Sequence, residues 1–514
     1  MKRSMFSRLA LIAILAVAVS ACSKKSEYIN VIPADATVVA SINLKSLAEK
    51  GGLKDKENEE AKQKLVDALQ NGMSAATFQQ IEMILKDPKK SGIDVTEPLY
   101  VFNSETFPYT SLVAKVSDEN DLNTLLKTLE DEKLCQAVAS GDGYQFTLMN
   151  NRTILAYNPF VFMLIEYKGA TQLEKIKESI PGLLKQTYDN SVASTAAFKK
   201  MQKMGGDMNT FFSLASLPGA DVNQIYGVSK DIDMKDLKLL GSISFDKGKI
   251  TIKYENSVEN PELKALFDKQ TKAICPIENT YLKHFPQSTL MLGSMGVNGE
   301  EFYNLLVENE EFRKNLPAIA TDEVKNLFGA FQKDITIGLT NITMNGVTFL
   351  ACANVKSATP VQMLYEKKNE LGLKRSEDIV QLGENEYVYK SRMMNVFFGV
   401  HGNNLYITND EALYKNIDES ADPSANDTQY ASNMKGKSSA CAINVEAILA
   451  LPVVKMLAEY GGAQYATALN LADKVSYMEA IGTNSNAEMI IHLKDKNVNA
   501  LKQIVDFIKQ FAGV

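Results

Sequence analysis

The sequence has 514 residues, a formal net charge of −7 at pH 7 and 45% hydrophobic residues. These values are typical of a folded protein rather than a disordered one, and the length predicts at least two domains, each with its own core. The net acidity argues against a nucleic-acid-binding protein, because no basic stripe is present to displace counterions from phosphates. Trp is absent, which argues against carbohydrate stacking without excluding it, since the 20 Tyr residues also offer aromatic rings.

The chain opens with a basic segment and an uncharged apolar run, residues 9–21, that ends at Cys22. The run is too short to span a bilayer comfortably and has the length of the apolar region of a secretory signal. An ordinary signal peptide is one interpretation; we favour a bacterial lipobox, Val19-Ser20-Ala21-Cys22. This motif resembles that of bacterial lipoproteins, whose Cys thiol is diacylated before cleavage and whose new amino terminus is then acylated. Several acyl chains on Cys22 are enough for stable anchoring in a membrane.

The predicted organisation is a signal peptide (residues 1–21), the lipidated Cys with a polar tether (22–30), and a first unit over residues 31–277. Within that unit, short apolar or alternating runs predict strands, and apolar residues at helical spacing predict helices such as 118–129. The predicted strands cover residues 37–42, 100–103, 111–116, 144–149, 153–157, 161–166, 211–217, 239–245 and 250–254.

The same order of elements begins again in residues 278–514. Ile243 and Leu263 have counterparts in Ile481 and Leu501, and both pairs are separated by the same number of residues. The fold class we expect is therefore α+β, with two similar halves from an internal duplication, each a mostly antiparallel sheet with helices packed on one face. The predicted strands cover residues 289–294, 334–344, 348–355, 386–391, 395–400, 405–408, 440–445, 474–482 and 488–493, with helices over 300–306, 360–371 and 499–511.

One stretch carries a family resemblance: Ile32-Pro33-Ala34-Asp35-Ala36-Thr37-Val38-Val39, directly after the tether. It resembles the opening of an uncharacterised lipoprotein family of Bacteroidetes, a domain of unknown function. The resemblance implies a lipoprotein whose body spans nearly all of the mature chain, and it assigns no activity and no catalytic residues. In such bacteria an acidic run after the lipid Cys resembles a surface-export signal, and Ser23-Lys24-Lys25-Ser26-Glu27 departs from it. We therefore expect anchoring in the outer membrane, facing the periplasm.

Four further cysteines, Cys135, Cys275, Cys352 and Cys441, are widely spaced and form no CxxC pair. Export permits disulfides, so a disulfide framework stays open as an alternative. We favour buried free thiols, because Cys352 and Cys441 lie inside apolar, strand-like runs.

No residue pattern points to catalysis, a cofactor or a metal. The three histidines, His284, His401 and His492, lie far apart and have no HExxH spacing. We expect His401 to be exposed beside a hairpin turn, and His492 to be a packed or rim residue of its strand rather than a ligand. Ser432 opens a formal SxxK, but no KTG follows it and no GxSxG elbow is present. No catalytic, cofactor-binding or metal-binding residue is therefore assigned, and Cys22 is the one predicted modification site.

These observations predict a lipid-anchored cell-envelope protein with a non-enzymatic binding or interaction role. Its expected partners are the membrane, through the acyl chains on Cys22, and an envelope protein or glycan, with no nucleic acid and no cofactor. The alternative is an envelope hydrolase that acts on glycan or peptide at a site between the two halves. Convergent carboxylates or a Ser/His pair in a pocket favour the hydrolase, and an apolar surface without such groups favours the binding protein.

Overall fold

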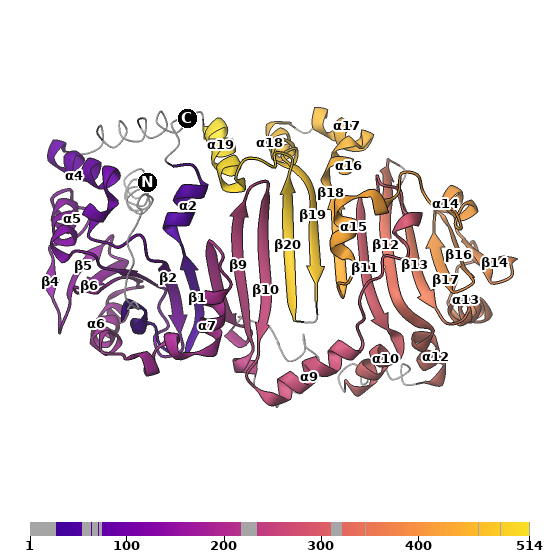
Figure 1. The fold of residues 1–514 in the computed structure, drawn as a ribbon, viewed down its shortest axis with the longest axis horizontal. Helices are drawn as coiled ribbons and strands as arrows, with labels where there is room; N and C mark the ends of the chain where they lie inside the picture. Colours follow the sequence, from indigo (N-terminus) through magenta and orange to yellow (C-terminus); the bar gives the residue numbers. More distant parts are fainter. Residues whose placement is uncertain are drawn as a thin grey trace. The chain divides into compact units, whose positions relative to one another are not determined.

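The structure, a computed structural model, describes residues 27–53, 63, 70, 74–216, 234–309, 321–344, 346–460, 462–483 and 485–512 (Figure 1). The chain divides into two compact units. Unit 1 contains the described residues of Met1–Pro218, Lys238–Ile252 and Lys496–Val514, and unit 2 contains those of Gly219–Leu237 and Lys253–Asp495. Cys22 and the apolar run before it lie outside the described residues.

Unit 1 is built on an antiparallel sheet whose strands pair in the order β9–β8–β1–β2–β3–β7–β6–β5–β4. A further strand, β10 (Lys249–Ser257), pairs with β9. The strands are β1 (Ala36–Ile42), β2 (Leu99–Ser104), β3 (Ser111–Lys115), β4 (Ala139–Ser140), β5 (Gln145–Met149), β6 (Thr153–Tyr157), β7 (Val161–Glu166), β8 (Met208–Ser213) and β9 (Lys238–Asp246).

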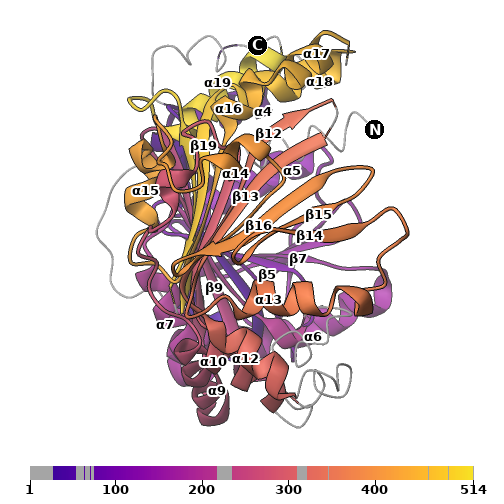
Figure 2. The same cartoon turned by 90° about the vertical axis from the view of Figure 1, so that its right-hand side faces the viewer.

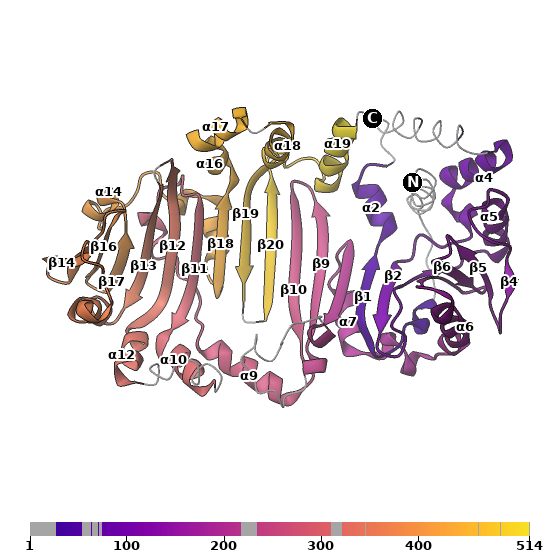
Figure 3. The same cartoon turned by 180° about the vertical axis from the view of Figure 1, so that it is seen from behind.

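Unit 2 repeats this order with its own strands, β19–β18–β11–β12–β13–β17–β16–β15–β14, again antiparallel throughout. Figure 3 shows the run from β13 through β12, β11 and β18 to β19 side by side. The strands are β11 (Met291–Asn298), β12 (Phe331–Thr343), β13 (Gly346–Val355), β14 (Asp378–Gly383), β15 (Glu386–Lys390), β16 (Asn395–His401), β17 (Asn404–Thr408), β18 (Ser439–Asn444), β19 (Val475–Gly482) and β20 (Asn486–Leu493).

The two units also agree in a detail at the start of each sheet. Pro33 forms an isolated antiparallel bridge with Ser191, and Pro286 forms the same kind of bridge with Ser424. In both places the residue after the Ser donates its backbone N–H at 2.8 Å to the carbonyl of the residue before the Pro. This agreement is what an internal duplication would produce, and the duplication itself stays a prediction.

The helices complete an α+β fold, as predicted. No helix in the described part of the chain combines the length and the apolar character needed to cross a bilayer. The helices of unit 1 are α2 (Leu44–Lys50), α4 (Ala75–Lys86), α5 (Glu119–Asp131), α6 (Ala170–Leu184), α7 (Ala196–Lys203) and α19 (Ala500–Ala512). Those of unit 2 are α9 (Pro261–Lys272), α10 (Gly299–Glu308), α12 (Asp322–Ala330), α13 (Thr359–Glu366), α14 (Glu411–Lys415), α15 (Gln429–Met434), α16 (Val445–Ala450), α17 (Pro452–Tyr460) and α18 (Gly462–Ala472).

Helices cover both faces of the unit 1 sheet, which differs from the predicted single face. Successive residues of β6 point to opposite faces. Ile154 belongs to a core cluster with α6 and α7, whereas Leu155 belongs to a second cluster with α4 and α5. The strands are apolar at successive positions, so both faces need cover, as in a sheet buried on two sides.

The two compact units differ from the predicted ranges 31–277 and 278–514 at the end of each range. Helix α9 comes from the first range and belongs to unit 2, where it packs on α10. Helix α19 comes from the second range and belongs to unit 1, where it packs on α2 and β9. Amphipathic spacing shows that one face of a helix is buried but does not say which sheet buries it.

The folded body begins earlier than the predicted end of the tether at residue 30. Residues Glu27–Val31 form a 3-10 helix, η1, in which Tyr28 is 1% exposed. The Tyr28 hydroxyl donates a hydrogen bond of 2.7 Å to the carbonyl of Pro98. The predicted extent of the tether is therefore wrong, because Tyr28 is buried and Ile29 packs against the same core cluster, which holds this segment to the body.

Candidate functional site: an apolar pocket in unit 2

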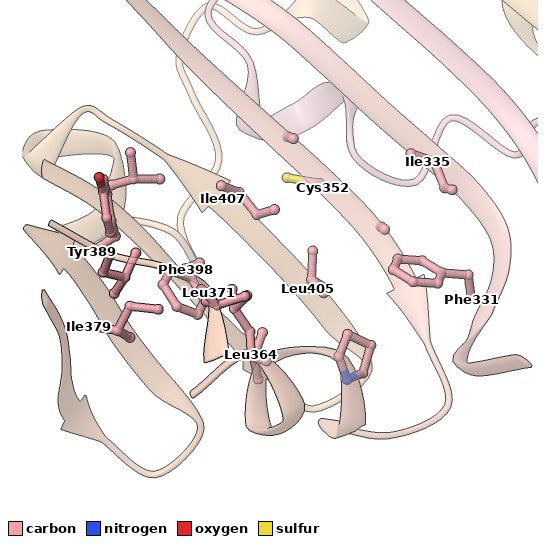
Figure 4. Close-up of a pocket in the computed structure, with 16 residues that line it drawn as sticks. Phe331, Ile335, Cys352, Leu364, Leu371, Ile379, Tyr389, Phe398, Leu405 and Ile407 are labelled. Carbon is pink, nitrogen blue, oxygen red and sulfur yellow. The ribbon is translucent and has the colours of Figure 1, made fainter. Parts of the chain in front are cut away.

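Unit 2 contains a pocket of about 530 Å³ on the face of the sheet that α13 covers (Figure 4). Its volume lies within the range of about 300–1,000 Å³ that is usual for small-molecule sites. Figure 2 shows α13 close to β14 and β16. The lining is almost entirely hydrocarbon and comprises Phe331, Ile335, Ala351, Cys352, Ala353, Pro360, Val361, Leu364, Leu371, Leu373, Ile379, Tyr389, Val396, Phe398, Leu405 and Ile407.

The floor of the pocket is formed by two rows of side chains that run across the sheet. One row follows the pairings of Ala351 with Ile407 and of Ile407 with Phe398. The other row follows the pairings of Ile335 with Ala353 and of Ala353 with Leu405. Residues two apart on a strand share a face, so the two rows form one apolar surface. The small side chains of Ala351 and Ala353 leave space above β13.

The roof comes from α13 and the segment that follows it. This helix has eight residues, begins with Pro at its first turn and buries only Val361 fully. The chain then turns at Gly372, whose φ of +66° favours glycine, and this turn lies between Leu371 and Leu373, which both line the pocket. Leu364 is 40% exposed and Leu371 is 45% exposed, although both line the pocket. The mouth of the pocket therefore lies between α13 and this segment.

The corresponding place in unit 1 is filled. Helix α5 follows β3 as α13 follows β13, but α5 has 13 residues. Four leucines of α5 are buried against β6 and β7, namely Leu122, Leu125, Leu126 and Leu129. The short α13 supplies fewer apolar side chains to the same face, and the remaining space is the pocket.

Two lining residues carry groups other than hydrocarbon. Burial raises the pKa of the Cys352 thiol to about 12, so it stays protonated and is a poor nucleophile. Desolvation, followed by the nearby carboxylate of Glu377, raises the pKa of the Tyr389 hydroxyl, so this group also stays neutral. No acid–base pair faces the pocket among its lining residues, and the site is suited to binding rather than to proton transfer.

His401 lies outside the pocket lining, in a polar cluster that sequence reasoning missed. Its Nε2 is hydrogen-bonded to Glu386, and its Nδ1 lies 3.1 Å from a carboxylate oxygen of Asp418. The other oxygen of Glu386 accepts a hydrogen bond of 3.2 Å from the Tyr414 hydroxyl. Burial lowers the pKa of His401, but the hydrogen bonds and charges of Glu386 and Asp418 outweigh it, and the net pKa is raised. His401 is therefore partly buried rather than exposed, with its side chain 30% exposed, because Glu386 and Asp418, which lie 15 and 17 residues away in the sequence, both contact its ring.

The other two histidines lie in separate contacts. His492 Nε2 lies 2.7 Å from the buried Glu479 carboxylate, and its ring stacks on Tyr477, so His492 is packed, which is one of the two positions expected. His284 Nδ1 contacts the Glu419 carbonyl at 3.0 Å, and burial lowers its pKa. None of the hydrogen bonds of the three histidines among the described residues involves a Ser or Cys side chain.

The four cysteines of the body are free, as favoured from the sequence. Cys135 and Cys352 are buried, whereas Cys275 and Cys441 are partly exposed. Within the described residues, no group of three or more His, Cys, Asp or Glu side chains is placed to hold a metal ion. Ser432 of the SxxK sequence lies on α15 and donates a hydrogen bond to the Gln429 carbonyl at the exposed surface.

The profile of the family described as "Domain of unknown function (DUF4836)" matches residues 28–501 of the chain. The chain belongs to this family. The predicted membership of a family of unknown function is thereby confirmed. The match begins at Tyr28, the first buried residue that the structure describes, and it includes every lining residue of the pocket.

Comparison with solved structures finds distant likenesses to TP0453. "Structure of crystal form I of TP0453" is 12% identical with a TM-score of 0.25, covering 50% of this DUF4836 chain and 90% of that chain. "Structure of crystal form IV of TP0453" is 12% identical with a TM-score of 0.24, covering 45% and 81% respectively. TM-scores this low carry no argument about fold or function. No curated protein matches the sequence.

Proposed function

We propose that this DUF4836 protein is a lipid-anchored envelope protein that binds an apolar molecule in the unit 2 pocket and performs no catalysis there. The carrying observation is the lining of the pocket, which has hydrocarbon walls, a mouth and no convergent acid–base groups. Binding to such a surface is driven by removing apolar area from water, and it needs no charged anchor inside the pocket.

The anchoring part of the proposal rests on the sequence around Cys22. The apolar run ends where small residues precede the Cys, and this is the arrangement of a bacterial lipobox. The opening Ile32–Val39 supports an origin in Bacteroidetes, and the non-acidic Ser23–Glu27 supports the periplasmic face of the outer membrane. Acyl chains on Cys22 keep the body at a lipid surface, where apolar ligands are concentrated.

A duplicated origin of the body is part of the proposal. The repeated order of strand pairing and the matching Pro–Ser bridges support it. After duplication, the longer α5 fills the sheet face in unit 1 and the shorter α13 leaves it open in unit 2. Unit 1 is thus the natural internal control for the binding role of unit 2.

The proposal is tested with the chain from Ser23 onward, which keeps every described residue and removes the need for detergent. Ala351 lines the floor of the pocket, so Ala351→Phe places a ring in the space a ligand needs. The matched control is Ala139→Phe, which makes the same change at an exposed position of β4 in unit 1. We expect an anilinonaphthalene dye to gain fluorescence with the parent chain and the control, and to gain little with Ala351→Phe. Equal fluorescence with all three proteins refutes a binding role for the pocket.

A further inference from the structure

We propose that the ligand of the pocket is a single-chain lipid with an anionic headgroup. Its acyl chain occupies the pocket, and its headgroup meets Arg375 and Arg392 at the rim. This inference rests on the proposed function and adds the chemical class of the ligand.

The size of the pocket selects one chain rather than two. If each water-sized group takes roughly 30 Å³, a pocket of about 530 Å³ holds on the order of 15 to 18 non-hydrogen atoms. A single medium-length acyl chain has this number of atoms, and a lipid with two such chains has about twice as many. The ligand is therefore expected to carry one chain.

The apolar surface is also longer than the pocket itself. Ile337 pairs with Ala351 and Met295 pairs with Ile335, so the two floor rows continue onto β12 and β11. There Ile337 is 56% exposed and Met295 is 42% exposed. An apolar strip that runs across several strands fits an elongated hydrocarbon chain better than a compact ring system.

The rim at the end of α13 carries the cations that select an anion. Leu373 lines the pocket, and the next two residues, Lys374 and Arg375, are exposed. Asp378 at the start of β14 pairs with Lys390 at the end of β15. This pairing brings the segment that contains Arg375 to the same end of the sheet as the β15–β16 turn, which contains Arg392.

Arg375 and Arg392 are two of the four arginines that follow residue 22 in an acidic chain. Neither forms an ion pair with another described residue, although acidic side chains are present along this rim. Those acidic groups already have basic neighbours: Asp378 contacts Lys368 at 3.1 Å, Glu377 contacts Lys374 at 3.9 Å, and Glu370 lies near Lys367. A guanidinium binds carboxylate and phosphate oxygens in a two-pronged geometry, so both arginines are available to an anionic headgroup.

The apolar residues beside these arginines complete an amphipathic rim. Met393 is 92% exposed, Met394 is 44% exposed, and Val396, two residues later, lines the pocket. Flexible methionine side chains adapt to irregular apolar partners. The first methylene groups below a headgroup are thus expected to contact Met393 and Met394 before the chain enters the pocket.

The test compares three amphiphiles that share one chain length: tetradecanoate, tetradecyl phosphate and methyl tetradecanoate. Binding to the chain from Ser23 onward is measured by calorimetry for the parent and for Arg375→Ala/Arg392→Ala. The matched control is Arg152→Ala, which removes an exposed arginine from the corresponding β5–β6 turn of unit 1. A comparison of the affinities for tetradecanoate and tetradecyl phosphate identifies the preferred headgroup.

We expect the double variant to bind the two anions more weakly, by about two- to fivefold for each arginine removed. Its affinity for the ester should not change, and the Arg152→Ala protein should bind all three amphiphiles as the parent does. Equal effects of the double variant on the anions and the ester overturn the headgroup assignment and leave apolar binding in place. Failure of all three amphiphiles to bind overturns the proposed function as well. Binding to anionic vesicles without binding of any free amphiphile also overturns the inference, since the rim then serves a membrane surface only.

Discussion

Two leucines on corresponding helices should separate stability from ligand binding. Leu126 on α5 is 1% exposed in the filled face of unit 1, whereas Leu364 on α13 is 40% exposed at the mouth of the pocket. Leu126→Ala leaves a closed cavity and is expected to cost about 2–5 kcal/mol in the free energy of unfolding. Leu364→Ala removes a side chain that is already partly in water and leaves no closed cavity. The lower estimate for full burial of a leucine side chain is about 1.5 kcal/mol. Because Leu364 is 40% exposed, its removal is expected to cost roughly 60% of that value, about 1 kcal/mol in the free energy of unfolding.

The expected effects on binding run in the opposite order. Leu364→Ala removes apolar area from the pocket, so it should weaken binding of an apolar probe, and Leu126→Ala should leave binding unchanged. Because a chain of two units need not unfold in one step, stability is best followed by hydrogen exchange of α5 and α13 separately. Equal loss of protection at the two helices, or weaker binding in the Leu126→Ala protein, refutes the assignment of filled and open faces.

Three further outcomes are expected. Cys22→Ala should abolish acylation and leave the protein soluble in the periplasm or unprocessed; processed protein that still requires detergent after membrane fractionation contradicts the anchor. The raised pKa of His401 means that its contacts with Glu386 and Asp418 stabilise the fold fully below the ordinary value of 6.5, and that this contribution is lost as pH rises through the raised pKa. His401→Ala should therefore flatten the dependence of unfolding free energy on pH just above 6.5, and an unchanged slope counts against the cluster. Cys352, with a pKa of about 12, should resist thiol reagents until the protein is denatured, which mass spectrometry of the labelled native chain can check.

Much of the fold was predictable because it follows from local patterns. The strand over 153–157 and the helix over 118–129 have periodic apolar residues, and the structure places β6 and α5 there. The predictions failed where the decisive contact is distant in sequence. Tyr28 looks like part of a polar tether until its hydrogen bond with Pro98 is known. Strand β14 was missed, because only Ile379 in its six residues is buried.

The pocket was missed for a related reason. Patterns report which residues are apolar, but a cavity arises where apolar residues are too few to fill the space between elements. The helix predicted over residues 360–371 ends at Glu366 in the structure, and Leu371 and Leu373 follow it in a turn, so helical spacing alone overestimates how much of the sheet α13 covers. The His401 cluster gave no local signal, since Glu386 and Asp418 approach it from separate elements.

The position of α19 in unit 1 has a consequence for the order of folding. Two hydrogen bonds tie the start of this segment to the β9–β10 turn: the Gly248 N–H donates to the Val498 carbonyl at 3.0 Å, and the Asn499 side chain donates to the Phe245 carbonyl at 2.9 Å. Unit 1 is therefore completed only after the chain has passed through residues Lys253–Asp495 of unit 2. For a flexible loop of roughly 240 residues, that closure costs on the order of 5 kcal/mol in chain entropy. Prior folding of unit 2 shortens the effective loop and lowers this cost. Helix α19 is thus expected to dock on α2 and β9 only after unit 2 has folded.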